Sequence, residues 1–304
     1  MKVLISGATG FIGSDLSSLL IDQGYTVHYL TTSKRKIEQK ENYKGFLWNP
    51  AKNQIDLKCL EGVEAIVNLA GHTINCKWNA TNKALIINSR IDSSDTLFKT
   101  LKENKHQVKY ILNVSAIGIY KSSYGNCYDE SNTNYGTDFL AEVCKQWEAA
   151  NLRFEQLEII TSITRLGLVL SKEGGVLHEL DKVVYKGLGA CLGNGKQWMS
   201  WVHKKDVIHS LIYLLTHQMS GTFNIVAPRP VIQKEFLEHL AQKRNRKLWL
   251  PNIPEFLIKI ALGQRAALVL SSQQVTSSKL ENKGYSFLHP GLESALNEIY
   301  HEAI

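Results

Sequence analysis

The sequence predicts an α/β protein, a doubly wound parallel sheet followed by a smaller, mostly helical C-terminal lobe. A strand-forming segment at 2–6 leads through a glycine-rich turn into a helical segment, and a second strand-forming segment begins at Thr26. Strand-like and helical segments then alternate as far as about residue 165, which is typical of parallel sheets covered on both faces. Beyond Arg165 the sequence is first rich in glycine and then mostly helical in pattern.

Each element follows from its own residue pattern. In the first helical segment Ile12, Leu16, Leu19 and Leu20 recur on one face, and Gly24 ends the helix. Strands are expected at 2–6, 26–30, 65–69, 110–115 and 159–165, and helices near 79–104 and 139–155. A helix at about 205–217 and a strand at 222–226 are expected to rejoin this sheet.

The domain prediction follows from this order of elements. Residues 1–165 are expected to form the main domain, to which 205–230 returns. Segments 166–204 and 231–304 are expected to form the smaller lobe. This lobe would cap the carboxyl ends of the strands, where open α/β sheets bind ligands.

Composition and charge exclude several classes of protein. The 304 residues include 35 Lys or Arg and 28 Asp or Glu, for a formal net charge of +7. This positive excess is spread along the chain, and its densest run is only 34–36, so we expect no nucleic-acid partner. No apolar run reaches the ~18 residues of a membrane span, so we expect no membrane partner. No pattern in the sequence specifies an oligomeric state.

The cysteines indicate a reducing compartment. Five of them are widely separated and form no Cys-x-x-Cys pair: Cys59, Cys76, Cys127, Cys144 and Cys191. Because this spacing is typical of neither a disulfide framework nor a zinc site, we predict no metal. The N-terminal residues lack the layout of a signal peptide, and we predict a cytoplasmic protein.

Three glycines predict a dinucleotide site of the Rossmann type. Gly7, Gly10 and Gly13 lie between a predicted strand and a predicted helix. Gly7 allows a tight turn, Gly10 lets the backbone approach a pyrophosphate, and Gly13 lets the helix pack closely on the strand. The N-terminus of the helix adds backbone N–H groups that favour an anion.

The end of the second strand predicts which dinucleotide binds. NAD-binding proteins place an acidic residue there to hold the ribose 2′-hydroxyl, whereas a 2′-phosphate needs basic partners. Here the segment 31–36 offers hydroxyls and three cations, and the first acidic residue is Glu38. We therefore predict NADP(H) in preference to NAD(H). The alternative is a solvated basic loop with no ligand.

The spacing G-x-x-G-x-x-G resembles that of the short-chain dehydrogenase/reductase superfamily, in particular its extended, sugar-nucleotide-epimerase-like branch. Further motifs narrow the resemblance: Asn68–Gly71, Asn88–Arg90, Ser115–Tyr120, Cys144–Glu148, Arg165–Leu170, Gly193–His203 and Phe223–Pro228. Their order is similar to that of one atypical subfamily, the bacterial epimerase family proteins related to human short-chain dehydrogenase family 39U member 1. The resemblance covers essentially the whole chain.

This resemblance implies a set of residues that line the cofactor. The set is Gly7, Ala8, Thr9, Gly10, Phe11, Ile12, Gly13, Thr31, Thr32, Ser33, Lys34, Arg35, Leu69, Ala70, Gly71, Arg90 and Val169. The subfamily usually has Arg where this chain has Thr32, so the phosphate contact is expected to pass to Lys34 or Arg35. Small residues at 69–71 would let the backbone approach the adenosine half, although an ordinary strand end has the same appearance.

The usual catalytic pair of the superfamily, Tyr-x-x-x-Lys, is absent. None of the twelve tyrosines is followed by Lys at that spacing, and alignment on Glu148 places Leu140 and Cys144 at the two positions. The resembling subfamily also lacks the pair. Two functions remain open: an NADP(H)-dependent oxidoreductase or nucleotide-sugar-epimerase-like enzyme acting on a small-molecule substrate, or a catalytically silent NADP-binding sensor or regulatory protein.

Three side chains are candidates for the missing chemistry. Ser115 would hydrogen-bond a substrate oxygen, and Tyr120 or His203 would donate a proton. Each has a structural alternative: Ser115 satisfying the backbone at a strand end, Tyr120 packed as an aromatic side chain, and His203 capping the next helix. Cys144 is interpreted as structural.

The segment 187–203 is predicted to contact the substrate through Gln197, Ser200 and Trp201. Its glycines would allow movement, and its two tryptophans would supply flat apolar walls, as in a lid over the nicotinamide. The alternative is a surface loop pinned by tryptophans packed into the small lobe.

Overall fold

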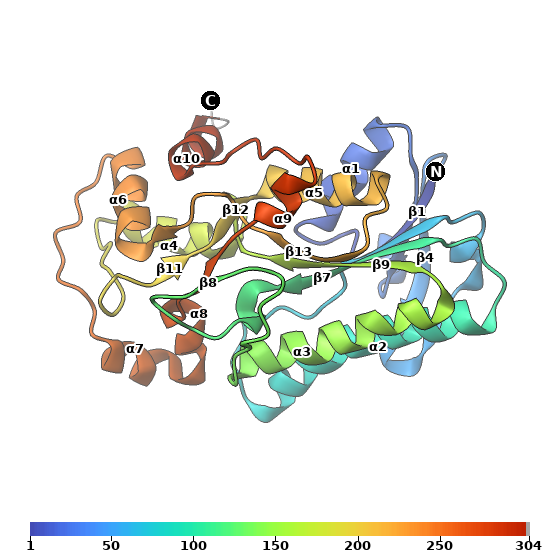
Figure 1. The fold of residues 1–304 in the computed structure, drawn as a ribbon, viewed down its shortest axis with the longest axis horizontal. Coiled ribbons are helices and arrows are strands. Elements are labelled where there is room, and N and C mark those ends of the chain that lie inside the picture. Colours follow the sequence, from blue (N-terminus) through green and yellow to red (C-terminus); the bar gives the residue numbers. More distant parts are fainter. Residues whose placement is uncertain (302–304) are drawn as a thin grey trace. The chain divides into compact units, whose positions relative to one another are not determined.

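The computed structural model describes residues 1–301, which form two compact units (Figure 1). The first unit comprises 1–115, 142–165 and 208–222. The second comprises 116–141, 166–207 and the described residues from 223 onward. Each unit is built from segments distant in sequence, so the chain passes between them several times.

Most of a large, mostly parallel sheet belongs to the first unit. Its strands are ordered β13-β9-β7-β6-β1-β2-β4-β3, with β5 (Gln54–Ile55) paired to β4. Their bounds are β1 Lys2–Ser6, β2 Thr26–Thr31, β3 Gln39–Lys40, β4 Tyr43–Asn49, β6 Ala65–Asn68, β7 Tyr110–Ala116, β9 Ile160–Leu166 and β13 Gly221–Ile225. The pair β1–β2 is parallel with Lys2 opposite Thr26, which confirms the parallel pairing that the sequence predicts.

The strands of the sheet are buried because helices cover both of its faces. Helices α1 (Gly13–Asp22) and α5 (Lys204–Thr216) lie on one side, and α2 (Ala80–Glu103) and α3 (Phe139–Leu152) lie on the other (Figure 1). All four residues of β6 are buried, as expected for a strand covered on both faces. This arrangement confirms the predicted doubly wound sheet.

Three strands of the sheet, β3, β4 and β5, are absent from the sequence prediction, and β4 is the longest of them. Strand β4 pairs in parallel with β2, and Gly45 lies opposite Tyr29. A Cβ atom at Gly45 would come within 2.5 Å of the Tyr29 ring, so this glycine makes room for the tyrosine. A glycine inside a strand weakens the sequence pattern by which a strand is recognised. Only the cross-strand neighbour Tyr29 explains why glycine occurs at this position.

The second unit combines several helices with three short strand pairs. The pairs are β10 (Leu168–Leu170) with β12 (Trp201–His203), β11 (Trp198–Met199) with β14 (Val231–Ile232), and β8 (Cys127–Tyr128) with β15 (Gln274–Val275). Its helices are α4 Gly175–Tyr185, α6 Gln233–Lys243, α7 Glu255–Leu262, α8 Ala267–Leu270, α9 Ser278–Asn282 and α10 Leu292–His301.

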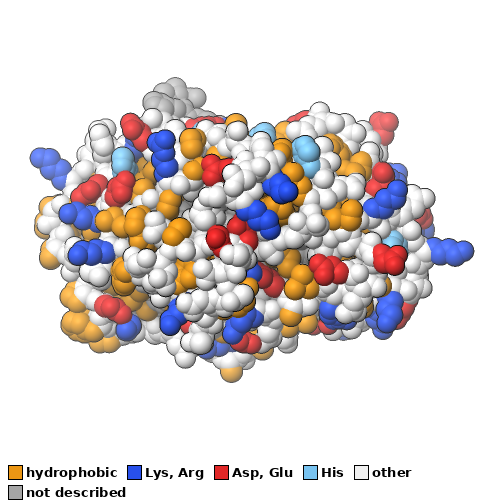
Figure 2. Space-filling model, viewed as in Figure 1, with side chains coloured by type: hydrophobic (Ala, Val, Ile, Leu, Met, Phe, Trp, Pro, Cys, Tyr) orange, Lys and Arg blue, Asp and Glu red, His pale blue; other side chains and the backbone are white. Residues whose placement is uncertain are grey.

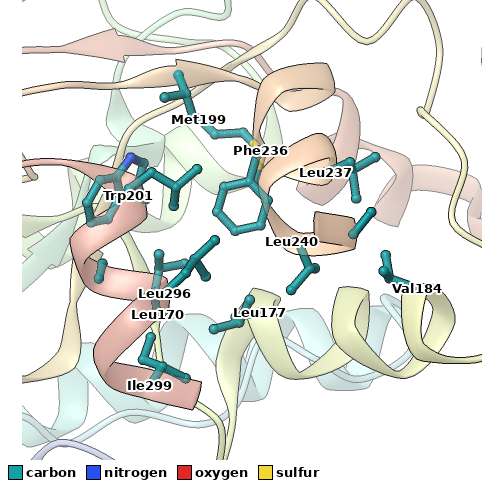
Figure 3. Packing of buried hydrophobic residues seen from close by; sticks show 14 of the residues in the cluster. Leu170, Leu177, Val184, Met199, Trp201, Phe236, Leu237, Leu240, Leu296 and Ile299 are labelled. Carbon is teal, nitrogen blue, oxygen red and sulfur yellow. The ribbon is translucent and has the colours of Figure 1, made fainter. Parts of the chain in front are cut away.

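The core of the second unit is apolar and centres on Trp201, which has no exposed surface. Phe236 of α6, Leu177 of α4 and Leu296 of α10 belong to the same buried cluster (Figure 3). Three helices thus bury one apolar face each against β12 and its neighbour β10.

Among the described residues, no helix is both long enough and apolar enough to cross a membrane.

Candidate functional site

The glycine-rich turn at the carboxyl end of β1 has the geometry of an anion cradle. Gly7 has a φ of +72°, and the N–H of Gly10 donates to its carbonyl oxygen over 3.0 Å. A Cβ atom at Gly13 would lie 2.2 Å from the Gly7 oxygen, so only glycine fits there. Helix α1 starts at this point, and its N-cap residue Ile12 provides no side-chain hydrogen bond. The first N–H groups of the helix are therefore not satisfied by a capping side chain.

A buried hydroxyl connects this turn with the end of β6. Ser6 Oγ accepts hydrogen bonds from the N–H groups of Leu69 and Ala70, both over 3.1 Å, and donates to Asn68 Oδ1 over 2.6 Å. A Cβ atom at Gly7 would meet the Leu69 carbonyl at 3.0 Å. The predicted cofactor residues of β1 and β6 therefore lie side by side. Ser6 and Asn68 were not among the predicted site residues, because a buried serine or asparagine has no distinctive local pattern.

The basic segment after β2 lies next to the glycine-rich turn. Lys34, Arg35 and Lys36 form a short 3-10 helix, and all three are exposed. Lys36 Nζ lies 3.5 Å from Thr9 Oγ1 within the turn. Thr31 is buried, and its hydroxyl accepts from the N–H of Ser33. The structure thus brings Lys36 to the edge of the anion cradle, and Lys34 and Arg35 belong to the same short 3-10 helix.

Thr32 lines a hollow at the same end of the sheet. The hollow has a volume of about 510 Å³, and Trp48, Asn49 and Asp56 are among its other lining residues. Thr32 is exposed, so its hydroxyl is accessible from this hollow.

Arg90 of α2 holds the segment that follows Ala70. Its Nη1 donates to the carbonyl oxygens of His72 and Ile86, and its guanidinium lies 4.8 Å from the ring centre of Trp147. Burial lowers the pKa of Arg90 from its ordinary value. A Cβ atom at Gly71 would meet this guanidinium at 3.2 Å. Val169, the last predicted cofactor residue, lies on β10 in the second unit.

Ser115 belongs to a buried polar cluster that the sequence alone does not reveal. Its hydroxyl donates to Oε1 of Glu148 over 2.7 Å. Arg165 pairs with the same carboxylate through two bonds, Nε to Oε1 at 2.9 Å and Nη2 to Oε2 at 2.8 Å. The three residues are 1%, 7% and 3% exposed. Glu148 and Arg165 occur within the family-like motifs, and that is the only sequence signal that marks them.

Tyr120 is buried in the second unit among oxygen atoms. Its hydroxyl lies 3.0 Å from the carbonyl oxygen of Asp129 and 2.9 Å from Asn224 Oδ1. Its ring stacks on Tyr128 with a centroid distance of 5.1 Å. One phenolic proton faces two acceptors, which is the arrangement of the packed alternative.

His203 is a buried imidazole in the second unit. Burial and the neighbouring His289 lower its pKa to about 4. Its Nδ1 lies 3.2 Å from the N–H of Lys205, and its ring centre lies 4.3 Å from that of His289. At pH 7 this imidazole is neutral, so it holds no readily released second proton.

Among the described residues, His203, Asp206 and His289 are the one group of three possible metal ligands, with ligand atoms within 4.8 Å of one another. Both oxygens of Asp206 accept backbone N–H groups, from Leu288 at 2.6 Å and from His289 at 3.0 Å. This carboxylate therefore anchors the segment before α10.

The three predicted substrate contacts are buried in the second unit. Gln197 Nε2 donates to the carbonyl oxygens of Leu192 and Val269, and Ser200 Oγ donates to that of Gln273. Trp201 lies in the apolar core. These contacts favour the packed alternative over a movable lid.

The comparisons with known proteins give the family. Residues 3–226 match the NAD dependent epimerase/dehydratase family. The chain belongs to this family. Residues 253–299 also match a domain of unknown function, DUF1731.

Several members of the family are similar over nearly the whole chain. The epimerase family protein YfhF of Bacillus subtilis is 32% identical over 98% of both chains. The chloroplastic SDR39U1 homolog of Arabidopsis thaliana is 33% identical over 98% of this chain and 86% of its own. The crystal structure of human SDR39U1 with NADPH is 28% identical, with a TM-score of 0.85 and 99% of both chains covered. The family resemblance seen in the motifs is thus confirmed.

Proposed function

We propose that this family member binds NADP(H) and acts as an oxidoreductase or nucleotide-sugar-epimerase-like enzyme on a small-molecule substrate. The observation that carries the proposal is the cradle at Gly7 and Gly13, with Lys36 beside it and Lys34 and Arg35 in the same 3-10 helix. The NADPH bound by human SDR39U1 supports the same cofactor here. Glycines leave room for a pyrophosphate at the start of α1, and Lys34 and Arg35 supply the positive charge that a 2′-phosphate needs.

The bound cofactor would supply or accept a hydride. The protein must then move one proton to or from the substrate oxygen, and this chain lacks the usual tyrosine and lysine for that step. Of the three candidates we carry Ser115 forward. Tyr120 is engaged by two oxygen acceptors, and His203 is neutral at pH 7. Ser115 lies near the carboxyl end of β7, the edge at which open α/β sheets bind ligands.

The hydrogen bond of Ser115 determines what its hydroxyl can do. Because its proton is donated to Glu148, its lone pairs remain available to accept from a substrate hydroxyl. A proton taken from that hydroxyl would pass through Ser115 to Glu148, and Arg165 would hold the carboxylate in place. We therefore assign substrate contact to Ser115, the role of proton acceptor to Glu148 and a positioning role to Arg165.

Titration of the purified protein with NADPH and NADH, followed by nicotinamide fluorescence, tests the cofactor proposal. We expect Lys34→Ala/Arg35→Ala to weaken NADPH binding about tenfold or more and to leave NADH binding unchanged. The two cations would contact only the 2′-phosphate, and NADH has no such group. The control is Lys102→Ala/Lys105→Ala, which removes two exposed cations elsewhere in the first unit. Wild-type binding of NADH as tight as that of NADPH would contradict the proposal.

The second candidate function is a catalytically silent NADP-binding sensor. The burial of Gln197, Ser200 and Trp201 favours it, because these side chains are already used in packing. Incubation with NADPH and a panel of carbonyl compounds separates the two functions. Oxidation of NADPH that Ser115→Ala abolishes would support the enzyme. NADPH binding without turnover on any compound would support the sensor.

A further inference from the structure

Helix α7 of the second unit exposes apolar side chains instead of burying them. Phe256, Leu257 and Ile260 are 62%, 46% and 78% exposed, whereas Ile258 on the opposite face is buried. Ile260 follows Leu257 by three residues and Phe256 by four, and these spacings place the three exposed side chains on one face of the helix. An amphipathic helix normally turns such a face toward the core, so this face is available for an external contact.

Two further exposed apolar side chains lie in the segment that leads into α7. Trp249 is 69% exposed and Ile253 is 38% exposed. Both are hydrogen-bonded to the glycine-rich loop of the same unit. Trp249 Nε1 donates to the carbonyl oxygen of Gly187, and the N–H of Ile253 donates to that of Cys191. Figure 2 shows hydrophobic side chains gathered at the lower left, where Figure 1 places α7. We call Trp249, Ile253, Phe256, Leu257 and Ile260 the α7 patch.

The α7 patch lies within the most basic part of the sequence. Residues 243–265 contain six Lys or Arg and one Glu. Arg244 pairs with Asp181 and Lys259 pairs with Glu255. Arg246 and Lys247 are exposed, and Arg246 Nε donates to a carbonyl oxygen, that of Tyr185. Exposed apolar side chains and nearby cations without an acidic partner among the described residues together fit a binding partner that has an apolar interior and a negatively charged surface.

We propose that the α7 patch docks this protein on the surface of an anionic lipid bilayer. Aromatic and aliphatic side chains enter the boundary between headgroups and acyl chains, and neighbouring Lys and Arg contact anionic headgroups. Trp249 is of the residue type most enriched at that boundary. A second copy of the chain fits less well, because it would bring a second basic segment against the first.

This proposal revises one expectation from the sequence. The sequence predicts no membrane partner because it contains no apolar run long enough to span a bilayer. Docking at an interface needs no such run, since it requires only an exposed apolar face beside basic residues. The proposal is also independent of the proposed function, because none of the α7 patch residues belongs to the cofactor or catalytic candidates.

Co-sedimentation with vesicles tests the docking proposal. We expect binding to phosphatidylcholine vesicles containing about 30% phosphatidylglycerol, weaker binding to pure phosphatidylcholine, and loss of binding at high ionic strength. Arg246→Gln/Lys247→Gln should weaken partitioning about 30-fold, because each cation near an anionic surface contributes about fivefold. Lys102→Gln/Lys105→Gln is the matched charge control and should bind as the wild type does.

The apolar contribution is tested with a second pair of variants. Phe256→Ser/Ile260→Ser should weaken vesicle binding at least about tenfold. Its thermal stability and NADPH affinity should not change, because both side chains are exposed and lie outside the core. The matched control is Leu85→Ser/Leu152→Ser, which removes two exposed leucines from α2 and α3. Equal binding by the two double variants would overturn the proposal. A dimer in light scattering that Phe256→Ser/Ile260→Ser dissociates would assign the α7 patch to a second copy and would also overturn it.

Discussion

Ser115 donates its hydroxyl proton to Oε1 of Glu148 over 2.7 Å, and neither side chain is exposed to water by more than 7%. The carboxylate also holds Arg165 through two hydrogen bonds. A serine at the carboxyl end of a strand is thereby attached to a buried charge pair. This cluster differs from the Tyr-x-x-x-Lys pair of the wider superfamily. The hydrogen bond to Glu148 fixes the orientation of the Ser115 hydroxyl.

Glu148→Gln should strongly destabilise the protein. The change leaves the buried guanidinium of Arg165 without its counter-charge, and breaking such a pair costs about 3–5 kcal/mol. The free energy of unfolding from urea denaturation measures this effect. Glu179→Gln is the control, because its pair with Lys182 is exposed and should contribute less than about 1 kcal/mol. A loss below about 1 kcal/mol for Glu148→Gln would show that the buried pair is not needed.

Gly13→Ala should damage both stability and cofactor binding. The new methyl group would lie 2.2 Å from the Gly7 oxygen, so the start of α1 must move away from the cradle. We expect a loss of about 1–3 kcal/mol in the free energy of unfolding, together with weaker NADPH binding. Gly125→Ala is the control, because a Cβ atom there meets nothing within 4 Å. Unchanged NADPH affinity in Gly13→Ala would place the pyrophosphate elsewhere.

Trp201→Ala tests the packed alternative for the segment 187–203. Its ring has no exposed surface, so we expect a loss of about 3–5 kcal/mol in the free energy of unfolding. Trp249→Ala, at an exposed tryptophan of the same unit, should cost less than about 1 kcal/mol. If Trp201→Ala instead keeps its stability and loses only substrate turnover, the segment acts as a lid.

His203 should make the protein less stable in mild acid. Its pKa is about 4 in the folded protein, against 6.5 for an exposed histidine, so the unfolded chain binds more protons between these values. The contribution of neutral His203 to the free energy of unfolding is complete above pH 6.5 and is lost as the pH falls toward 4. Denaturation at several pH values measures this slope.

Two variants isolate the contribution of His203 to that slope. His203→Gln should flatten it, because the titrating imidazole is gone. His217→Gln, which removes an exposed imidazole, should not change it. An unchanged slope in His203→Gln would show that another group titrates in this range.

Local patterns were sufficient to predict the frame of this protein. The strand at 2–6, the glycines at 7, 10 and 13, and the first helix are neighbours in sequence, and their periodicity specifies both their type and their order. The parallel pairing of β1 with β2 and the doubly wound sheet follow from that order, and both are confirmed. Such features need few long-range contacts to be recognised.

The tertiary structure alone decided what the polar and apolar side chains do. Glu148 lies 33 residues from Ser115 in sequence and 17 from Arg165, so no local pattern reports their cluster. The local sequence around Trp201 is compatible with a lid and with a core, and only its neighbours Phe236 and Leu296 show that it is packed. Periodicity identifies the apolar face of a helix, but whether that face is buried depends on segments brought beside it by the rest of the chain. For this reason the exposed face of α7 could not be recognised before the fold was known.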